Sequence, residues 1–374
     1  MLRDALNIKL GGKITPKPLR YSVIMPRVAI ENLKLIEVDD LISLIGKDLE
    51  TIRCVLANSS YEEHISALAP DKIDSFSIER ALLQNYVETH KKLVKFSSGN
   101  IKNLLLAFLK KFEVSNVKAL LRAVKAEIPV DEAIRHIVPV GSLDENRCLS
   151  ILAESKGISD VINFLSSLEY GLIVKSALSR HERIEDLMRL EVELDKSVYQ
   201  EMLESAERLK GADKKISKDI IGIELDAINV RIILKCKTLG ITRELIKDYL
   251  MPTALFDEDT LEEVTKAAST KAMISCLLNV AEAGNAVYKN IFTQMLKECE
   301  APLSRFEAIL DKAPLNMSLY MLKKHTRYYN IGFVLAFLNL KWMEIKNLRC
   351  IINGSERKIP PSQVRKLLVL PGEW

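Results

Sequence analysis

The sequence predicts an all-α protein in which three similar helical domains follow one another. Only 14 of the 374 residues are Gly and 12 are Pro, and aromatic residues make up 6%. Strands need aromatic and β-branched residues between Gly/Pro turns, whereas Leu, Ala, Glu and Lys favour helices. Apolar residues recur at helical spacing along most of the chain, and one helical pattern occurs three times. At roughly 150 residues per domain, the length fits two or three domains.

The first third begins with an extension that we do not expect to be regular. Two Gly and three Pro within the first 26 residues break helices, and regular structure is expected from about Tyr21. The last helix of this third stops before Pro129. The helices predicted here cover residues 39–56, 77–96 and 101–126.

The second and third parts of the chain continue with helices and carry no long linker. In the second part, Gly240 is a plausible helix end. In the third part, Gly354 is expected to close one long helix, and Pro360 and Pro361 precede a short one. The predicted helices cover residues 146–153, 159–168, 181–206 and 216–238, then 259–266, 270–280, 287–296, 304–311, 319–352 and 362–368.

The most informative feature is an internal repeat, which reads acid-x-x-Asn-apolar-base. Its Asn residues are Asn116, Asn229 and Asn347, at nearly even spacing. Fixed-period self-similarity indicates a repeat architecture. Together the copies contain Glu113, Asn116, Lys118 and Arg122; Asp226, Asn229, Arg231 and Lys235; and Glu344, Asn347 and Arg349.

The acid and the amide of each copy are carried toward a packed surface. At 100° per residue, Glu113 falls on the apolar stripe of its helix and Asn116 at its border. Buried acids and amides need partners. In the first reading, acid and Asn bond to neighbouring helices inside each unit. In the second, this face borders a central opening and touches a partner protein. In the third, the carboxylate is catalytic, although no His or second acid recurs beside it.

Charge and motifs argue against most other functions. The chain has 54 basic and 50 acidic residues, too even a balance for a typical nucleic-acid binder. It has neither of the glycine-rich phosphate-binding loops, no zinc-ligand spacing and no nucleophile elbow. We therefore expect no catalytic residue, cofactor, metal or small-molecule substrate. Five isolated histidines are expected on the surface or bonded in the core: His64, His90, His136, His181 and His325.

The cysteines and the hydropathy predict that the protein is exposed to the cytosol. The six cysteines are scattered without a Cys-x-x-Cys pair, so we expect reduced thiols buried as small apolar groups. No signal peptide is apparent. The longest apolar stretch, near 331–340, falls well short of the roughly 20 residues of a spanning helix. Any membrane contact must go through a partner or the surface.

The repeat, its spacing and the chain length resemble the C subunit of archaeal A-type ATP synthases, whose counterpart in vacuolar-type ATPases is the d subunit. The resemblance covers the chain from about Tyr21 onward. Ile78-Glu79-Arg80 and the three repeat helices carry it, together with an ending in which Glu344-x-x-Asn347-Leu-Arg349 and a Gly precede a Pro-x-x-x-Val-Arg helix.

The resemblance implies a funnel of three helical domains about a pseudo-threefold axis. Its wide end is expected to receive the soluble central stalk, and its other face to sit on the membrane proteolipid ring. The protein would transmit torque, without chemistry, at the cytoplasmic face of the membrane. On this basis residues 1–20 are an extension, and the repeat units are expected to span 21–138, 139–255 and 256–374.

Other classes of function stay open at this point. A free-standing helical scaffold that binds soluble proteins is the main alternative, although solenoid repeats usually run 20–50 residues. A nucleic-acid-binding protein would show affinity that falls steeply with salt. An enzyme with an unrecognised site has no constellation of residues to support it.

Overall fold

A computed structural model describes residues 21–68, 73–168, 170–171, 174, 187–284, 286–325 and 330–370. Within these ranges the chain is all-α and contains no strand, only an isolated bridge between Val140 and Leu143. The predicted fold class is therefore confirmed. The predicted extension, and the part of the 181–206 helix before Leu187, lie outside the described residues.

Three long helical hairpins form the centre of the molecule. The second helix of each carries the repeat, and we call α7, α13 and α19 the motif helices. The first helices, α6, α12 and α18, are called the lead helices. The hairpins are α6 (Ser75–Lys95) with α7 (Gly99–Lys125), α12 (Leu187–Glu207) with α13 (Ala212–Thr238), and α18 (Leu303–His325) with α19 (Ile331–Glu356).

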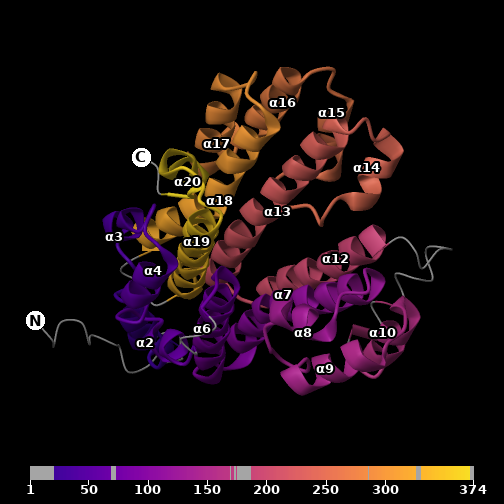
Figure 1. Ribbon diagram of the computed structural model, residues 1–374. Coiled ribbons are helices and arrows are strands. Elements are labelled where there is room, and N and C mark those ends of the chain that lie inside the picture. Colours follow the sequence, from indigo (N-terminus) through magenta and orange to yellow (C-terminus); the bar gives the residue numbers. More distant parts are fainter. Residues whose placement is uncertain are drawn as a thin grey trace, which may run out of the picture.

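Shorter helices surround these hairpins in three groups, which Figure 1 shows at the lower left, at the lower right and at the top. The first group is α2 (Ile24–Asn32), α3 (Val38–Ser43), α4 (Leu49–Leu56) and α5 (Glu62–Ser66). The second is α8 (Val130–Ala133), η3 (Ile134–His136), α9 (Glu145–Glu154) and α10 (Ile158–Leu165). The third is α14 (Arg243–Tyr249), α15 (Glu258–Lys266), α16 (Thr270–Glu282) and α17 (Ala286–Lys297). The last helix, α20 (Pro361–Leu367), follows α19.

The three motif helices end in the same way. A residue with positive φ follows each helix: Glu127 (51°), Gly240 (68°) and Lys358 (53°). The next residue is always Ile, whose N–H bonds back to the carbonyl five residues earlier at 2.9, 2.9 and 2.8 Å. This is the Schellman arrangement, which satisfies carbonyls that would otherwise lack donors. Gly240 is a helix end as predicted, and the other two ends use residues that adopt positive φ at a cost.

Three predicted helices are divided differently in the structure. The helix expected over 39–56 is two helices, because Gly46 adopts φ +80° and Asp48 caps α4 through the Thr51 N–H. The helices expected over 304–311 and 319–352 are divided elsewhere. α18 runs through Pro314, whereas Asn330 caps a new helix through the N–H of Gly332.

Gly354 does not end α19 as predicted but lies inside it. A Cβ at this position would come within 2.6 Å of Val364 Cγ2. The glycine therefore lets α20 pack directly on the last turn of α19.

Candidate functional site

Each motif Asn clamps the backbone of the segment that follows its own helix. Asn116 donates to the Val138 carbonyl at 2.7 Å and accepts from the Val138 N–H at 3.1 Å. Asn229 binds both backbone groups of Met251 at 3.3 and 2.7 Å. Asn347 binds those of Val369 at 2.9 and 2.8 Å.

In every copy the clamped residue lies 22 positions after the Asn. All three amides are at most 5% exposed. A side-chain amide offers one donor and one acceptor group to a backbone unit, which no apolar side chain can replace.

Each motif acid accepts a hydrogen bond from a tyrosine hydroxyl. Tyr170 donates to Glu113, and Tyr288 donates to Asp226 at 2.6 Å. Asp226 also accepts from the N–H groups of Leu255 and Phe256, at 3.1 and 3.3 Å. These carboxylates are engaged by donors of the same chain, although Tyr170 and Tyr288 lie outside the spans predicted for the units of Glu113 and Asp226.

The third acid finds its partners at the opposite end of the chain. Tyr61 donates to Glu344 Oε1 at 2.6 Å, and the Ile36 N–H donates to Oε2 at 2.5 Å. The same two kinds of donor, a loop N–H and a tyrosine, serve Asp226. The N-terminal helices therefore occupy, around α19, the place that α15–α17 occupy around α13.

Burial changes the pKa of these groups. Desolvation raises the pKa of Asp226 to about 6, although the Tyr288 hydroxyl and two backbone N–H groups oppose the change. Desolvation likewise raises the pKa of Glu344. Lys341 is 2% exposed, with Nζ 4.3 Å from the centre of the Tyr61 ring, and its burial lowers its pKa.

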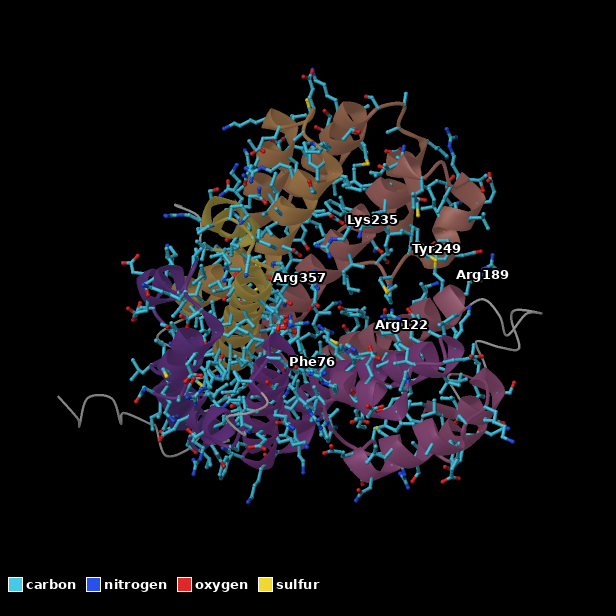
Figure 2. The ribbon with its side chains drawn as sticks, in the orientation of Figure 1. Phe76, Arg122, Arg189, Lys235, Tyr249 and Arg357 are labelled. Atoms are coloured by element: carbon cyan, nitrogen blue, oxygen red, sulfur yellow. The ribbon has the colours of Figure 1, made fainter. Side chains whose placement is uncertain are left out.

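The motif bases pair with acids on the next lead helix, so that three seams join the hairpins. In the first seam (α7 with α12), Lys118 pairs with Asp195 at 2.6 Å and Arg122 with Glu191 at 2.5 Å. In the second (α13 with α18), Arg231 pairs with Asp311 at 2.7 Å and Lys235 with Glu307 at 2.8 Å. Arg122 and Lys235 are labelled near the middle of the molecule in Figure 2.

The third seam joins α19 to α6 and closes the circle. Arg349 pairs with Glu79 at 2.8 Å, and Asn353 also donates to Glu79. By position, Asn353 replaces Arg122 and Lys235, and Leu83 replaces Asp195 and Asp311. This seam therefore keeps one ion pair of a motif base where each of the other two has two.

A cavity of about 460 Å³ lies where the three motif helices converge. Its charged side chains are paired across helices. Lys111 of α7 binds Glu224 of α13 at 2.7 Å, and Tyr199 of α12 donates to the same carboxylate at 2.8 Å. Aromatic side chains also line it, with the Phe112 ring of α7 and the Trp342 ring of α19 5.4 Å apart. The charged side chains of the cavity are thus paired with one another. Among the residues described it offers no nucleophile–base pair.

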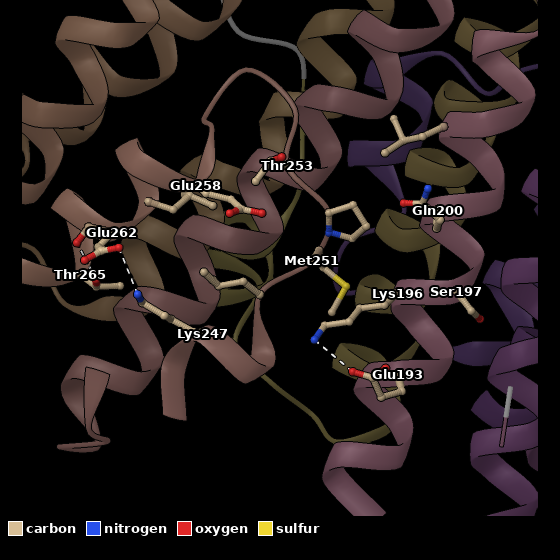
Figure 3. A pocket seen from close by; sticks show the side chains of 14 residues that line it. Glu193, Lys196, Ser197, Gln200, Lys247, Met251, Thr253, Glu258, Glu262 and Thr265 are labelled. Carbon is tan, nitrogen blue, oxygen red and sulfur yellow. Dashed lines mark hydrogen bonds and ion pairs between the residues drawn. The ribbon is translucent and has the colours of Figure 1, made fainter. Parts of the chain in front are cut away.

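A second cavity, of about 960 Å³, opens between α12 and the α14–α15 region. Figure 3 looks into it and shows Glu193, Lys196 and Gln200 on one side, Lys247, Glu258 and Glu262 on the other, and Met251 between them. Two ion pairs among its lining residues each join residues of the same side. Lys196 binds Glu193 at 3.1 Å, and Lys247 binds Glu262 at 3.0 Å.

The histidines and cysteines differ in part from the prediction. His90 is buried and bonds to the Leu105 carbonyl, as expected of a core histidine. His64 is not isolated, because it pairs with Glu88 at 3.3 Å, and Glu63 lies beside them.

All six cysteines are free. Only Cys148 and Cys236 are buried, and Cys54 is exposed, so the expected burial is wrong for the others. His181 and the side chain of His325 lie outside the described residues.

The sequence located the motif residues but missed their partners. The three tyrosines lie at different distances from the acids, and Tyr61 precedes its acid, so no fixed spacing revealed them. The lead-helix acids did carry a signal. Glu79, Glu191 and Glu307 recur at intervals of 112 and 116 residues, close to the spacing of the repeat itself.

Comparison with known proteins identifies relatives of this chain by sequence. The family model for the ATP synthase (C/AC39) subunit matches residues 24–367. The C subunit of the A-type ATP synthase of Methanocaldococcus jannaschii is 26% identical, over 93% of this chain and 86% of that protein. The proteins of the same name from Methanosarcina mazei (23%; 94% and 93%) and Pyrococcus furiosus (21%; 96% and 92%) are also similar. No helix in the described part of the chain is long and apolar enough to span a membrane.

Proposed function

This chain belongs to the ATP synthase (C/AC39) subunit family, a non-catalytic subunit of the rotary ATPase, and from that premise we propose that it is a rotor adapter. In this role it links the soluble central stalk to the membrane proteolipid ring. It transmits torque between them, so that ATP synthesis or hydrolysis is coupled to ion transport. It lies peripherally at the cytoplasmic face of the membrane and contacts the membrane through the ring only.

The observation that carries this proposal is the closed circle of hairpins. Each hairpin is tied to the next by ion pairs, and each motif Asn and acid fixes the outer helices to their long helix. Densely packed helices transmit strain rather than absorb it. A body that must pass rotation from one partner to another needs such stiffness. The same arrangement supports a funnel about a pseudo-threefold axis, with the stalk in its wide end.

We also propose a division of the chain that differs from three consecutive thirds. The contacts of Glu344 favour a third unit composed of α18–α20 together with α2–α5. The first unit would then be α6–α10 and the second α12–α17. Under this division the N-terminal helices complete the unit that the C-terminal helices begin.

Reconstitution of the complex tests the proposed role. Membrane vesicles that carry the ring are combined with the soluble ATPase head and stalk, with and without this chain. We expect ATP hydrolysis in both mixtures but ATP-driven ion pumping only when the chain is present. Co-sedimentation of the stalk with the vesicles should likewise require the chain. Pumping of equal rate without it would contradict the proposal, and a soluble pool bound to unrelated proteins would favour the scaffold alternative.

A further inference from the structure

Three equivalent places in the fold hold each lead helix against the segment that its own motif Asn clamps. We call them the first joint (α6 with residues 134–145), the second joint (α12 with 247–262) and the third joint (α18 with 368–370). The repeat makes them comparable residue by residue. Val87, Tyr199 and Leu315 correspond on the lead helices, because they follow Glu79, Glu191 and Glu307 by eight residues.

Apolar side chains fill the first and third joints. In the first, Val87 of α6 packs in one buried cluster with Val138 and Val140. In the third, Leu315 of α18 packs in one buried cluster with Val369 and Met343. The first joint is also held by the edge-to-face contact of Phe76 with His136, whose ring centres are 4.7 Å apart. Both joints are therefore closed by apolar packing.

The second joint is open on its outer side, whereas Tyr199 and Met251 belong to the main buried apolar cluster. The 960 Å³ cavity lies in it, lined from both sides. Tyr199 does not fill it, because its hydroxyl is engaged by Glu224 beside the 460 Å³ cavity between the motif helices, which we call the central cavity. Polar contacts across it include Lys196 Nζ to the Asp248 carbonyl at 2.6 Å and Arg189 to the Asp248 carboxylate at 3.9 Å. Met251 lines both this 960 Å³ cavity and the central cavity.

We propose that the second joint is the compliant joint of the circle, at which α14 and α15 move against α12 while the other two joints stay closed. A filled apolar contact resists separation because opening it exposes apolar surface to water. A water-accessible cleft spanned by a few charged contacts offers little resistance, since water replaces those contacts at small cost. Elements with few buried apolar contacts open locally at low free energy.

The motion alters the wall of the central cavity, because Met251 forms part of that wall. In the rotor role proposed above, the joint lets the stalk socket change its width at one side. The inference itself rests on the geometry of the isolated chain, and its test does not involve the other subunits. Failure of the test would leave the rotor role intact, and failure of the reconstitution would leave the joint intact.

Distances between pairs of nitroxide labels test the proposal in the full-length chain, in which exposed Cys54 and the partly exposed Cys276, Cys299 and Cys350 are replaced by Ser. One pair, Gln200→Cys with Asp259→Cys, spans the second joint. The matched control, Glu88→Cys with Asn146→Cys, occupies the corresponding positions of the first joint. All four residues are exposed. Double electron–electron resonance should give a distance distribution about twofold wider across the second joint. Equal widths, or a wider distribution across the first joint, would overturn the proposal.

Hydrogen exchange on the unmodified chain guards against a labelled variant that fails to fold. The corresponding helices α9 and α15 both start after a capping Asp, Asp144 and Asp257. We expect the amides of α15 to exchange faster than those of α9. Equal protection of the two helices would overturn the proposal independently of the labels.

Discussion

Tyr61 donates a hydrogen bond of 2.6 Å to Glu344, a residue 283 positions later in the chain. Tyr61 is fully buried and Glu344 is 6% exposed. This bond ties the N-terminal helices to the last motif helix, in the way that Tyr288 serves Asp226 within one stretch of chain. The circle of hairpins is thus completed by the two ends of the polypeptide.

Replacing Tyr61 by Phe should therefore destabilise the whole protein. The buried Glu344 carboxylate would lose a donor, which costs about 1–3 kcal/mol. Urea unfolding measures the change in the free energy of unfolding. Tyr320→Phe is the control, because its hydroxyl contacts only exposed Lys324 among the described side chains, and we expect a change within about 0.5 kcal/mol. Equal losses in both variants would show that the Glu344 bond does not matter to stability.

The Asn clamps predict a loss of stability when the amide is replaced by an apolar side chain of similar size. Asn229→Leu leaves the buried N–H and carbonyl of Met251 without partners, which should cost about 2–4 kcal/mol. Asn103→Leu, at an exposed position of α7, is the control and should leave the melting temperature nearly unchanged. Should Asn229→Leu keep its melting temperature but lose binding to the stalk, the interface reading of the motif would be the correct one.

Two of the three motif helices end in a non-glycine residue with positive φ, which costs conformational energy that a glycine would not. Glu127 and Lys358 occupy positive φ where the second copy has Gly240. Glu127→Gly and Lys358→Gly should each stabilise the fold by up to about 1 kcal/mol, because glycine adopts this conformation without the steric cost of a Cβ. The reverse change, Gly240→Ala, should destabilise by about 1 kcal/mol. Thermal unfolding of the three variants checks the opposite signs, and a loss of stability in both glycine variants would contradict the argument.

The ion pair of Lys118 with Asp195 should show favourable coupling across the first seam. Both side chains are partly buried, at 19% and 35% exposed. A double-mutant cycle with Lys118→Ala and Asp195→Ala should give a coupling energy of about 0.5–1 kcal/mol. Coupling should weaken as salt is added, since partly exposed charges are screened. A cycle with no coupling at low salt would mean that the seam is held by packing alone.

Asp226 should make stability depend on pH in a defined direction. Its pKa is raised from 3.8 to about 6 in the folded chain, so folding favours its protonated form. Its contribution is therefore greatest below pH 4 and falls as pH rises through 6, by about 3 kcal/mol in total.

Comparing the pH dependence of unfolding in wild type and Asp226→Asn isolates this group, because Glu344 and Lys341 titrate in both proteins. We expect the wild type to lose stability relative to the variant between pH 4 and pH 7. Parallel curves over that range would show that Asp226 keeps an ordinary pKa.

The sequence alone determined the fold class, the repeat and most of the helices. Those features depend on local periodicity, which neighbouring residues carry: the stripe around Asn116 and the helix end at Gly240 could both be read from a short window. The boundary at Asn330 was misjudged because no Gly or Pro marks the end of the preceding helix, although Asn is a preferred N-cap residue. Nothing local distinguishes Pro314, which lies inside a helix, from a proline that ends one.

Only the tertiary structure decided which partner each motif residue has. The Asn bonds 22 residues ahead in every copy, but the acid of the third copy bonds backward to Tyr61 and Ile36. A periodic pattern assigns a residue to a face of a helix, whereas the element that covers that face depends on how the chain closes on itself. The open second joint has the same origin, since the residues that fill or leave a gap are brought together from separate helices.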